Sequence, residues 1–199
     1  MLKLKIHVTC VISALLTLAG GQVLRGQTEG PGQGEKSSPA SVRIVYSGVG
    51  GYAGSVVELP FYVSASVPLG SMESELEFPK KVLEFFKASE SSILEAAEYV
   101  NFSAEVLAKD NSESEAVLKL RFEAGGNEEK SLPTGLLAII SFRIAADADT
   151  GDLQLKHSVV AKSPGSTQNP IRDLTASSPL VSIYPKGFDP LVPCFFFTH

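Results

Sequence analysis

Apolar and polar side chains alternate in short runs along most of the chain that follows Ser41. Successive side chains of a β-strand point to opposite faces, so a period of two predicts strands that are buried on one face. Glycine, proline and small polar residues separate the runs and supply the turns between them. We therefore expect about nine strands, at residues 42–46, 57–63, 72–78, 82–87, 102–106, 116–123, 135–144, 153–161 and 180–184.

The segment Gly135–Gly151 contains the clearest of these strands. One face would carry Ala138, Ile140, Phe142 and Ile144, and the other face would carry Leu137, Ile139, Ser141 and Arg143. A strand that is apolar on both faces where it begins is typical of the interior of a sheet. An Asp- and Gly-rich turn then ends it.

Only the segment Ser91–Tyr99 favours a helix, because Ser91 or Ser92 can cap it and three good helix formers follow, Glu95, Ala96 and Ala97. Many short strands with almost no helix are typical of two packed antiparallel sheets. We expect an all-β fold, a jelly-roll-like antiparallel β-sandwich of about nine strands with at most one short helix.

The first residues have the pattern of a secretory signal peptide, with a basic start, a short apolar run and small residues before position 22. The apolar run is shorter than the ~20 residues that span a bilayer, although an uncleaved anchor is the alternative. We expect a secreted or extracytoplasmic protein whose mature chain does not span a membrane. Its expected parts are a signal peptide at 1–21, a flexible tether at 22–40, the domain at 41–185 and a tail at 186–199.

The chain is acidic, with a formal net charge of −5. Removal of residues 1–21 would take away two lysines and no acid, which leaves about −7. Negative charge repels phosphate backbones, so nucleic acid is not an expected partner. Of the two cysteines, Cys10 lies in the expected signal peptide and Cys194 near the end, so the mature chain has no internal disulfide. Its stability must come from an apolar core.

Three segments resemble cohesin-type domains, which belong to a superfamily of β-sandwiches shared with carbohydrate-binding modules. Gly51–Val63 resembles the family's Gly-x-x-Gly turn and second strand, and Ser74–Phe85 resembles its Val-Leu-x-Phe corner. Gly135–Gly151 resembles its Gly-x-Leu-x-x-Ile-x-Phe strand. The chain departs from the family at Phe78, which stands where the family usually has Asp before the corner proline. The resemblance covers residues 41–185.

Cohesins bind a dockerin through one sheet face, and the resemblance implies that such a face lies here on the strands 72–78, 102–106, 116–123 and 153–161. Its outward residues would be Glu73, Glu75, Glu77, Ser103, Glu105, Lys119, Arg121 and Lys156. This mixed and mostly acidic face would steer a basic, dockerin-like protein partner. The alternative is that the charges only keep a half-exposed sheet from aggregating.

Catalysis is not expected, because the sequence has no nucleophile elbow, no His-Glu-x-x-His pair and no nucleotide-binding loop. No cofactor is expected either. Residues 147–152 contain three aspartates, but the glycine stands one place early for an EF-hand and Ser158 occupies the position of the bidentate Glu. We interpret this segment as a polar turn and expect no metal site.

A polysaccharide is the alternative ligand. Planar sugar sites usually use Trp, and this chain has none, while its five tyrosines are spread over different strands and loops. The apolar stretch 191–197 would add to a sheet edge, pack on the domain or pair through Cys194, unless it has no role. We therefore expect an exported, non-catalytic module that presents a sheet face to a protein, with carbohydrate binding as the alternative.

Overall fold

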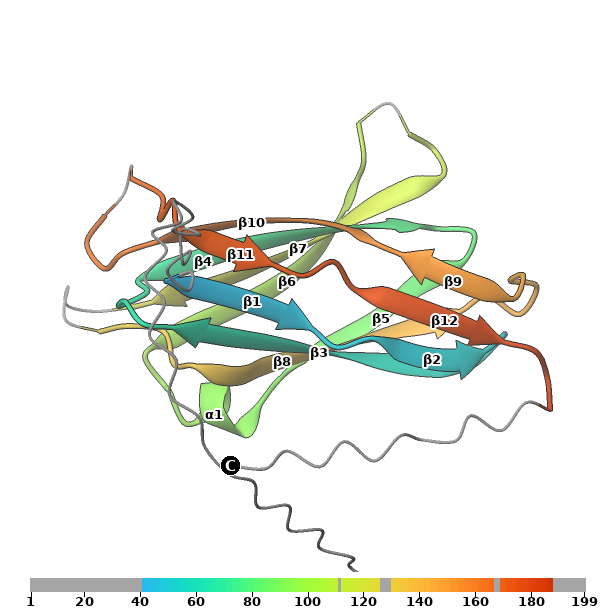
Figure 1. Ribbon diagram of the computed structural model, residues 1–199, viewed down its shortest axis with the longest axis horizontal. Helices are drawn as coiled ribbons and strands as arrows, with labels where there is room; N and C mark the ends of the chain where they lie inside the picture. The colour runs from blue at the N-terminus through green and yellow to red at the C-terminus, as the bar shows by residue number, and fades with distance from the viewer. Residues whose placement is uncertain (1–40, 111, 126–129, 167–168, 188–199) are drawn as a thin grey trace, which may run out of the picture. The chain divides into compact units, whose positions relative to one another are not determined.

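The computed structural model describes residues 41–187, except 111, 126–129 and 167–168, so the expected signal peptide, tether and nearly all of the tail lie outside the described residues. The described chain contains one short helix, α1 (Ser92–Glu95), and twelve strands (Figure 1). The strands are β1 (Val42–Tyr46), β2 (Val49–Tyr52), β3 (Val56–Ala65), β4 (Ser71–Pro79), β5 (Leu83–Glu90), β6 (Val100–Ala108), β7 (Glu115–Ala124), β8 (Gly135–Ile144), β9 (Gly151–Gln154), β10 (Lys156–Lys162), β11 (Leu174–Ala176) and β12 (Leu180–Tyr184).

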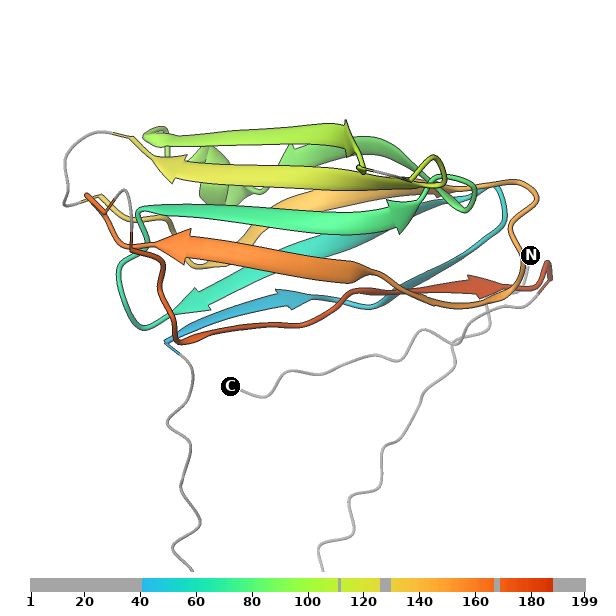
Figure 2. The ribbon, with the colours of Figure 1, turned by 90° about the horizontal axis from the view of Figure 1, so that it is seen from above.

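Two larger sheets pack face to face, which confirms the expected β-sandwich (Figure 2). One has five strands in the order β11-β1-β3-β8-β5, and the other has four in the order β10-β4-β7-β6. The strand β8 lies between β3 and β5, so the prediction of an interior strand is confirmed. Neighbouring strands are antiparallel in both sheets, apart from the parallel pair β1 and β11.

A third sheet, in the order β2-β12-β9, joins the two layers along one side of the sandwich. Each of its strands continues a strand of a larger sheet: β2 follows β1, β12 follows β11, and β9 precedes β10. The single strand expected at 153–161 is therefore two strands, divided at Leu155 between two sheets. This division, together with the short strands β2 and β11, accounts for twelve strands where about nine were expected.

The strand β2 corrects the expectation that the glycines after position 47 only interrupt the chain. It pairs in parallel with β12, Gly51 opposite Ile183. A Cβ atom on Gly51 would lie 2.6 Å from the Ser55 hydroxyl and 2.6 Å from a methyl of Val57. Glycine is required here because another segment approaches the backbone closely.

The core lies between the two larger sheets and contains the residues that the alternation placed inside. Val57, Leu59, Phe61 and Val63 of β3 are buried, and so are Leu76 and Phe78 of β4 and Leu118, Leu120 and Phe122 of β7. Aromatic rings meet across the seam: Phe61 stacks on Phe122 with ring centroids 5.3 Å apart, and Phe78 meets Phe142 edge to face at 5.1 Å. These contacts fix how the two layers face each other.

The expected helical turn is α1, and of the two expected capping residues, Ser91 and Ser92, it is Ser91 that caps the helix. The backbone N–H of Leu94 donates to the Ser91 hydroxyl at 3.3 Å, and Ser91 in turn donates to the carbonyl oxygen of Leu136. Leu94 is buried against the core. The cap therefore anchors the crossover between the two sheets to β8.

Candidate partner-binding face

The outward side chains of the four-stranded sheet form a surface that we call the charged face. The sheet consists of the strands that the family resemblance had indicated, with β10 alone in place of 153–161. Outward residues alternate with buried ones along β4, where Met72, Ser74 and Leu76 face the core. The face brings together the expected residues on adjacent strands: Glu73, Glu75, Glu77, Ser103, Glu105, Lys119, Arg121 and Lys156.

Lys119 lies at the centre of the charged face between two glutamates of β4. Its Nζ is 2.5 Å from Oε1 of Glu73 and 3.1 Å from Oε1 of Glu75, and its side chain is only 14% exposed. The hydrogen bonds that Lys119 donates to the carboxylates of Glu73 and Glu75 raise the pKa of Lys119. Desolvation pulls the pKa of Glu73 upward, but hydrogen bonds from Lys119 and Arg121 outweigh it and lower that pKa.

A second cluster lies at the end of the face where β6 leads into β7. The Nζ of Lys109 is 2.7 Å from Oε2 of Glu77 and 2.6 Å from Oε2 of Glu115. Lys156 reaches the same oxygen of Glu77 at 3.9 Å. Sequence reasoning missed Lys109 and Glu115, because it treated their segment only as a hairpin loop or strand end.

The ion pairs add residues of both signs to the charged face. Lys109 and Lys162 join the three expected cations, and Glu115 and Glu123 join the four expected acids, so the excess of one acid is unchanged. The charge of the face is thus mixed with slightly more acids than cations, and its steering of a basic partner stays a prediction. Among the expected acids, Glu105 is exposed and forms no ion pair with any residue that the structure describes.

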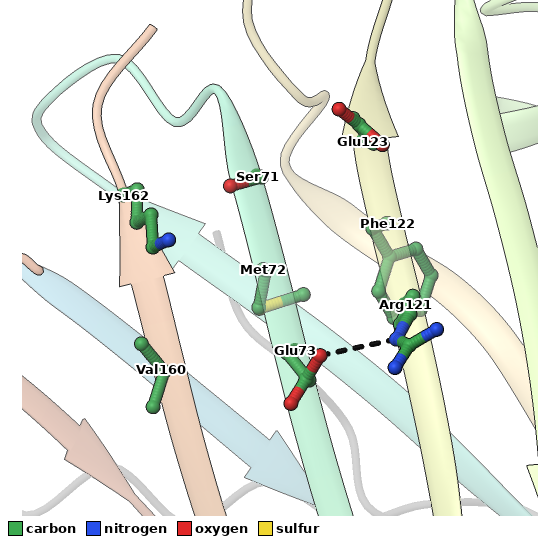
Figure 3. Close-up of a pocket in the computed structure, with 8 residues that line it drawn as sticks. All are labelled: Ser71, Met72, Glu73, Arg121, Phe122, Glu123, Val160 and Lys162. Atoms are coloured by element: carbon green, nitrogen blue, oxygen red, sulfur yellow. Dashed lines mark hydrogen bonds and ion pairs between the residues drawn. The ribbon is translucent and has the colours of Figure 1, made fainter. Parts of the chain in front are cut away.

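A shallow hollow of about 290 Å³ lies at the other end of the charged face (Figure 3). Arg121 and Glu73, joined at 3.1 Å through Nε, lie on one side, and Val160 and Lys162 of β10 lie on the other. The Arg121 side chain is 56% exposed and Val160 is 48% exposed. Sequence reasoning missed Val160, although its place two residues after the outward Ser158 indicates the same face.

A polar chain crosses the core directly beneath this face. The Tyr46 hydroxyl lies 2.9 Å from Oγ of Ser74, which lies 3.0 Å from Nε2 of His157. Burial lowers the pKa of His157 to about 4, against a smaller opposing effect of a hydrogen bond with the Ser177 backbone. Burial likewise raises the pKa of Tyr46. A Ser–His hydrogen bond also occurs in nucleophilic catalysis, but Ser74 is completely buried and cannot reach a substrate.

The tyrosines do not form the flat platform that sugar binding uses. Tyr46 is buried, Tyr62 lies on the outer face of the other large sheet, and the Tyr99 hydroxyl donates to the carbonyl of Ser131. Tyr52 and Tyr184 meet edge to face on the three-stranded sheet, with centroids 6.3 Å apart. The aromatic rings are thus distributed over separate surfaces.

Within the described ranges, no three His, Cys, Asp or Glu side chains come together to hold a metal ion. A search of the same residues finds no helix with the length and hydropathy needed to cross a membrane.

Cohesins are among the solved structures with a similar fold. The third ScaC cohesin of Acetivibrio cellulolyticus, solved with the ScaB dockerin, has a TM-score of 0.58 at 16% identity, over 72% of this chain and 99% of its own. The OlpC cohesin of Clostridium thermocellum, solved with the dockerin Doc435, has a TM-score of 0.53 at 21% identity, over 75% of this chain and 98% of its own. A non-cellulosomal cohesin of the archaeon Archaeoglobus fulgidus has a TM-score of 0.54 at 15% identity, over 74% of this chain and 94% of its own.

No protein-family model matches the sequence, and no curated protein matches it either. The likeness is therefore one of structure, and it extends over nearly the whole length of each cohesin. It agrees with the resemblance of the three sequence segments, which fall on β2–β3, on β4–β5 and on β8. The described part of this chain has the fold of a cohesin-type domain.

Proposed function

We propose that this protein is a non-catalytic binding module that captures a dockerin-like protein on the charged face. The observation that carries the proposal is the composition of that face. The face consists of four adjacent antiparallel strands, and cross-strand ion pairs hold most of its outward charges in place. Charged side chains that are already fixed favour one orientation of a partner, because they lose little conformational entropy when the partner binds.

The face also offers apolar area beside these charges. Val160 is 48% exposed at one border, and Leu107 is 36% exposed at the other. An interface of this kind suits a protein partner with apolar side chains between polar ones. Solved cohesins with the same fold were captured together with dockerins, which supports this class of partner. Export of the protein, as expected from residues 1–21, forms part of the proposal.

A pair of matched substitutions tests the location of the site. Val160→Lys places a charge on the charged face, while Val56→Lys places the same charge on the outer face of the five-stranded sheet, where Val56 is 46% exposed. Binding of purified dockerin modules to the full chain is measured by isothermal titration calorimetry. We expect Val160→Lys to weaken binding at least tenfold and Val56→Lys to leave it within twofold.

Equal losses from both substitutions would remove the charged face from consideration. If no module of a broad dockerin panel binds the unmodified chain, the dockerin-like partner is wrong. Retention of the chain on polysaccharide affinity gels would then favour the carbohydrate alternative, and uniform absence of retention would dismiss it.

A further inference from the structure

No described strand covers the side of the sandwich opposite the three-stranded sheet. The strands β5 and β6 are the outer strands of the two larger sheets there, and among the described residues each pairs with a neighbouring strand on one side only. Figure 2 shows β6 along the border of its sheet, beside β7, with no described strand beyond it. The outward backbone groups of an edge strand are able to pair with another strand.

The edge strands differ in how well they are protected from such pairing. β5 is interrupted by a bulge at Phe86 and carries charged residues at Glu84 and Lys87, while β10 carries lysines at both ends. β11 has only three residues. β6 has nine residues in continuous register with β7, without a bulge or proline, and Glu105 is its single charged residue. Charges, bulges and shortness are the usual devices that prevent edge pairing, and of these β6 has only the one charge of Glu105.

Apolar surface accompanies this unprotected edge. Val106 is 42% exposed although it lies on the side of β6 that faces the other sheet, and Leu107 beside it is 36% exposed. Val106 also lines an open hollow of about 380 Å³ between the two sheets, together with Phe78, Leu83 and Phe85. An added strand would cover this apolar border as well as the free backbone groups.

We propose that the strand added to β6 is the β6 of a second copy of this chain. Two identical strands pair antiparallel about a twofold axis, and all nine residues have a partner only when the axis passes midway between the two Ala104 residues. In this register Phe102 lies opposite Val106 of the second copy, and Val100 lies opposite its Ala108. Apolar side chains therefore meet apolar ones on the inner face, which extends the seam of the sandwich into the second copy.

This register also keeps the Glu105 carboxylates of the two copies apart. Glu105 lies opposite Ser103 of the second copy. A register centred on Glu105 would instead place the two carboxylates directly opposite each other. The twofold axis is perpendicular to the sheet, so both charged faces point to the same side of an eight-stranded sheet. The dimer thus presents two partner-binding faces side by side, a bivalent arrangement that goes beyond the function proposed for one face.

Two opposite substitutions at one exposed residue test this register. Ser103→Lys would place a cation opposite Glu105 twice in the dimer, and Ser103→Glu would place an anion there. Sedimentation velocity of the full chain over a range of concentrations gives the dimer dissociation constant. We expect Ser103→Lys to lower the dimer dissociation constant and Ser103→Glu to raise it, each by about tenfold relative to the unmodified chain at low salt. Shifts in the same direction, or no shift, would overturn the proposal.

Three further outcomes are decisive. Val160→Lys, on the far edge of the same sheet, should leave the dissociation constant unchanged even where it abolishes capture of a partner. A chain that stays monomeric up to about 200 μM contradicts the proposal. A chain without residues 188–199 should dimerise as the full chain does, and loss of the dimer on this deletion would assign the association to the apolar segment 191–197 instead.

Discussion

Oγ of Ser74 lies 3.0 Å from Nε2 of His157, inside a seam that is otherwise packed with aliphatic and aromatic side chains. Ser74 belongs to β4 and His157 to β10, and Tyr46 of the opposite sheet completes the chain of hydrogen bonds. The imidazole ring also meets the Tyr46 ring edge to face at 4.7 Å. This polar chain joins the two layers next to the edge of the charged face.

The burial of His157 predicts that acid weakens the fold. The pKa of His157 is lowered to about 4, below its ordinary value near 6.5. Between these values the unfolded chain binds a proton that the folded chain does not bind. The free energy of unfolding therefore falls as the pH falls from about 6.5 to about 4, and this histidine adds no further loss below that range.

His157→Gln isolates this contribution, because glutamine does not titrate. We expect the stability of the unmodified chain to fall between pH 6.5 and 4 by on the order of 2 kcal/mol more than that of the variant, after allowance for partial exposure of the ring. Urea unfolding at several pH values measures the difference. Parallel pH profiles for the two proteins would show that His157 is not involved.

The Tyr46 hydroxyl predicts a second stability effect. Tyr46→Phe removes one hydrogen bond and leaves the hydroxyl of Ser74 bonded to His157 alone, at a cost of about 1 kcal/mol. Tyr62→Phe, at a half-exposed position on the outer face of the five-stranded sheet, is the matched control and should change stability by less than about 0.5 kcal/mol. Urea unfolding at pH 7 compares the two variants, and equal effects would contradict the role of the buried hydroxyl.

The alternation of apolar residues sufficed to predict the layers, because burial of one strand face has the same period whatever the neighbouring strands are. It placed Leu59, Phe61 and Phe142 inside and Glu73 and Arg121 outside, as the structure has them. The strands β2 and β11 escaped prediction, because three or four residues are too few for a period and their pairing with distant strands is not local.

In the candidate site, too, some features follow from the sequence and others only from the structure. The residues of the charged face follow from alternation and from the family resemblance together, and their role in binding stays a prediction. The polar chain of Tyr46, Ser74 and His157 connects residues that are 28 and 83 positions apart, and nothing in their local sequence indicates that they meet. Lys109 likewise joins Glu77 only because β4 and the β6–β7 connection lie side by side.

The ion pairs of Lys119 predict a salt-dependent contribution to stability. Lys119→Met leaves Glu73 and Glu75 close together on β4 without the cation between them. We expect the melting temperature to fall by a few degrees in low salt and by less in 1 M salt, because screening weakens the repulsion of the two carboxylates. Differential scanning calorimetry at both salt concentrations measures this. A loss that does not depend on salt would mean that the aliphatic part of Lys119 matters and its charge does not.

The core predicts the largest effect of a single substitution. Phe142 is completely buried on β8 and contacts the rings of Phe78 and Phe85, so Phe142→Ala should lower the free energy of unfolding by about 3–5 kcal/mol. Phe86→Ala is the control, because Phe86 is exposed on β5. The Cζ atom of Arg143 lies over its ring, 5.3 Å from the ring centroid. Phe86→Ala should cost less than about 1 kcal/mol. Chemical unfolding followed by circular dichroism compares the two, and a Phe142→Ala variant as stable as Phe86→Ala would contradict the packing of the two layers around this ring.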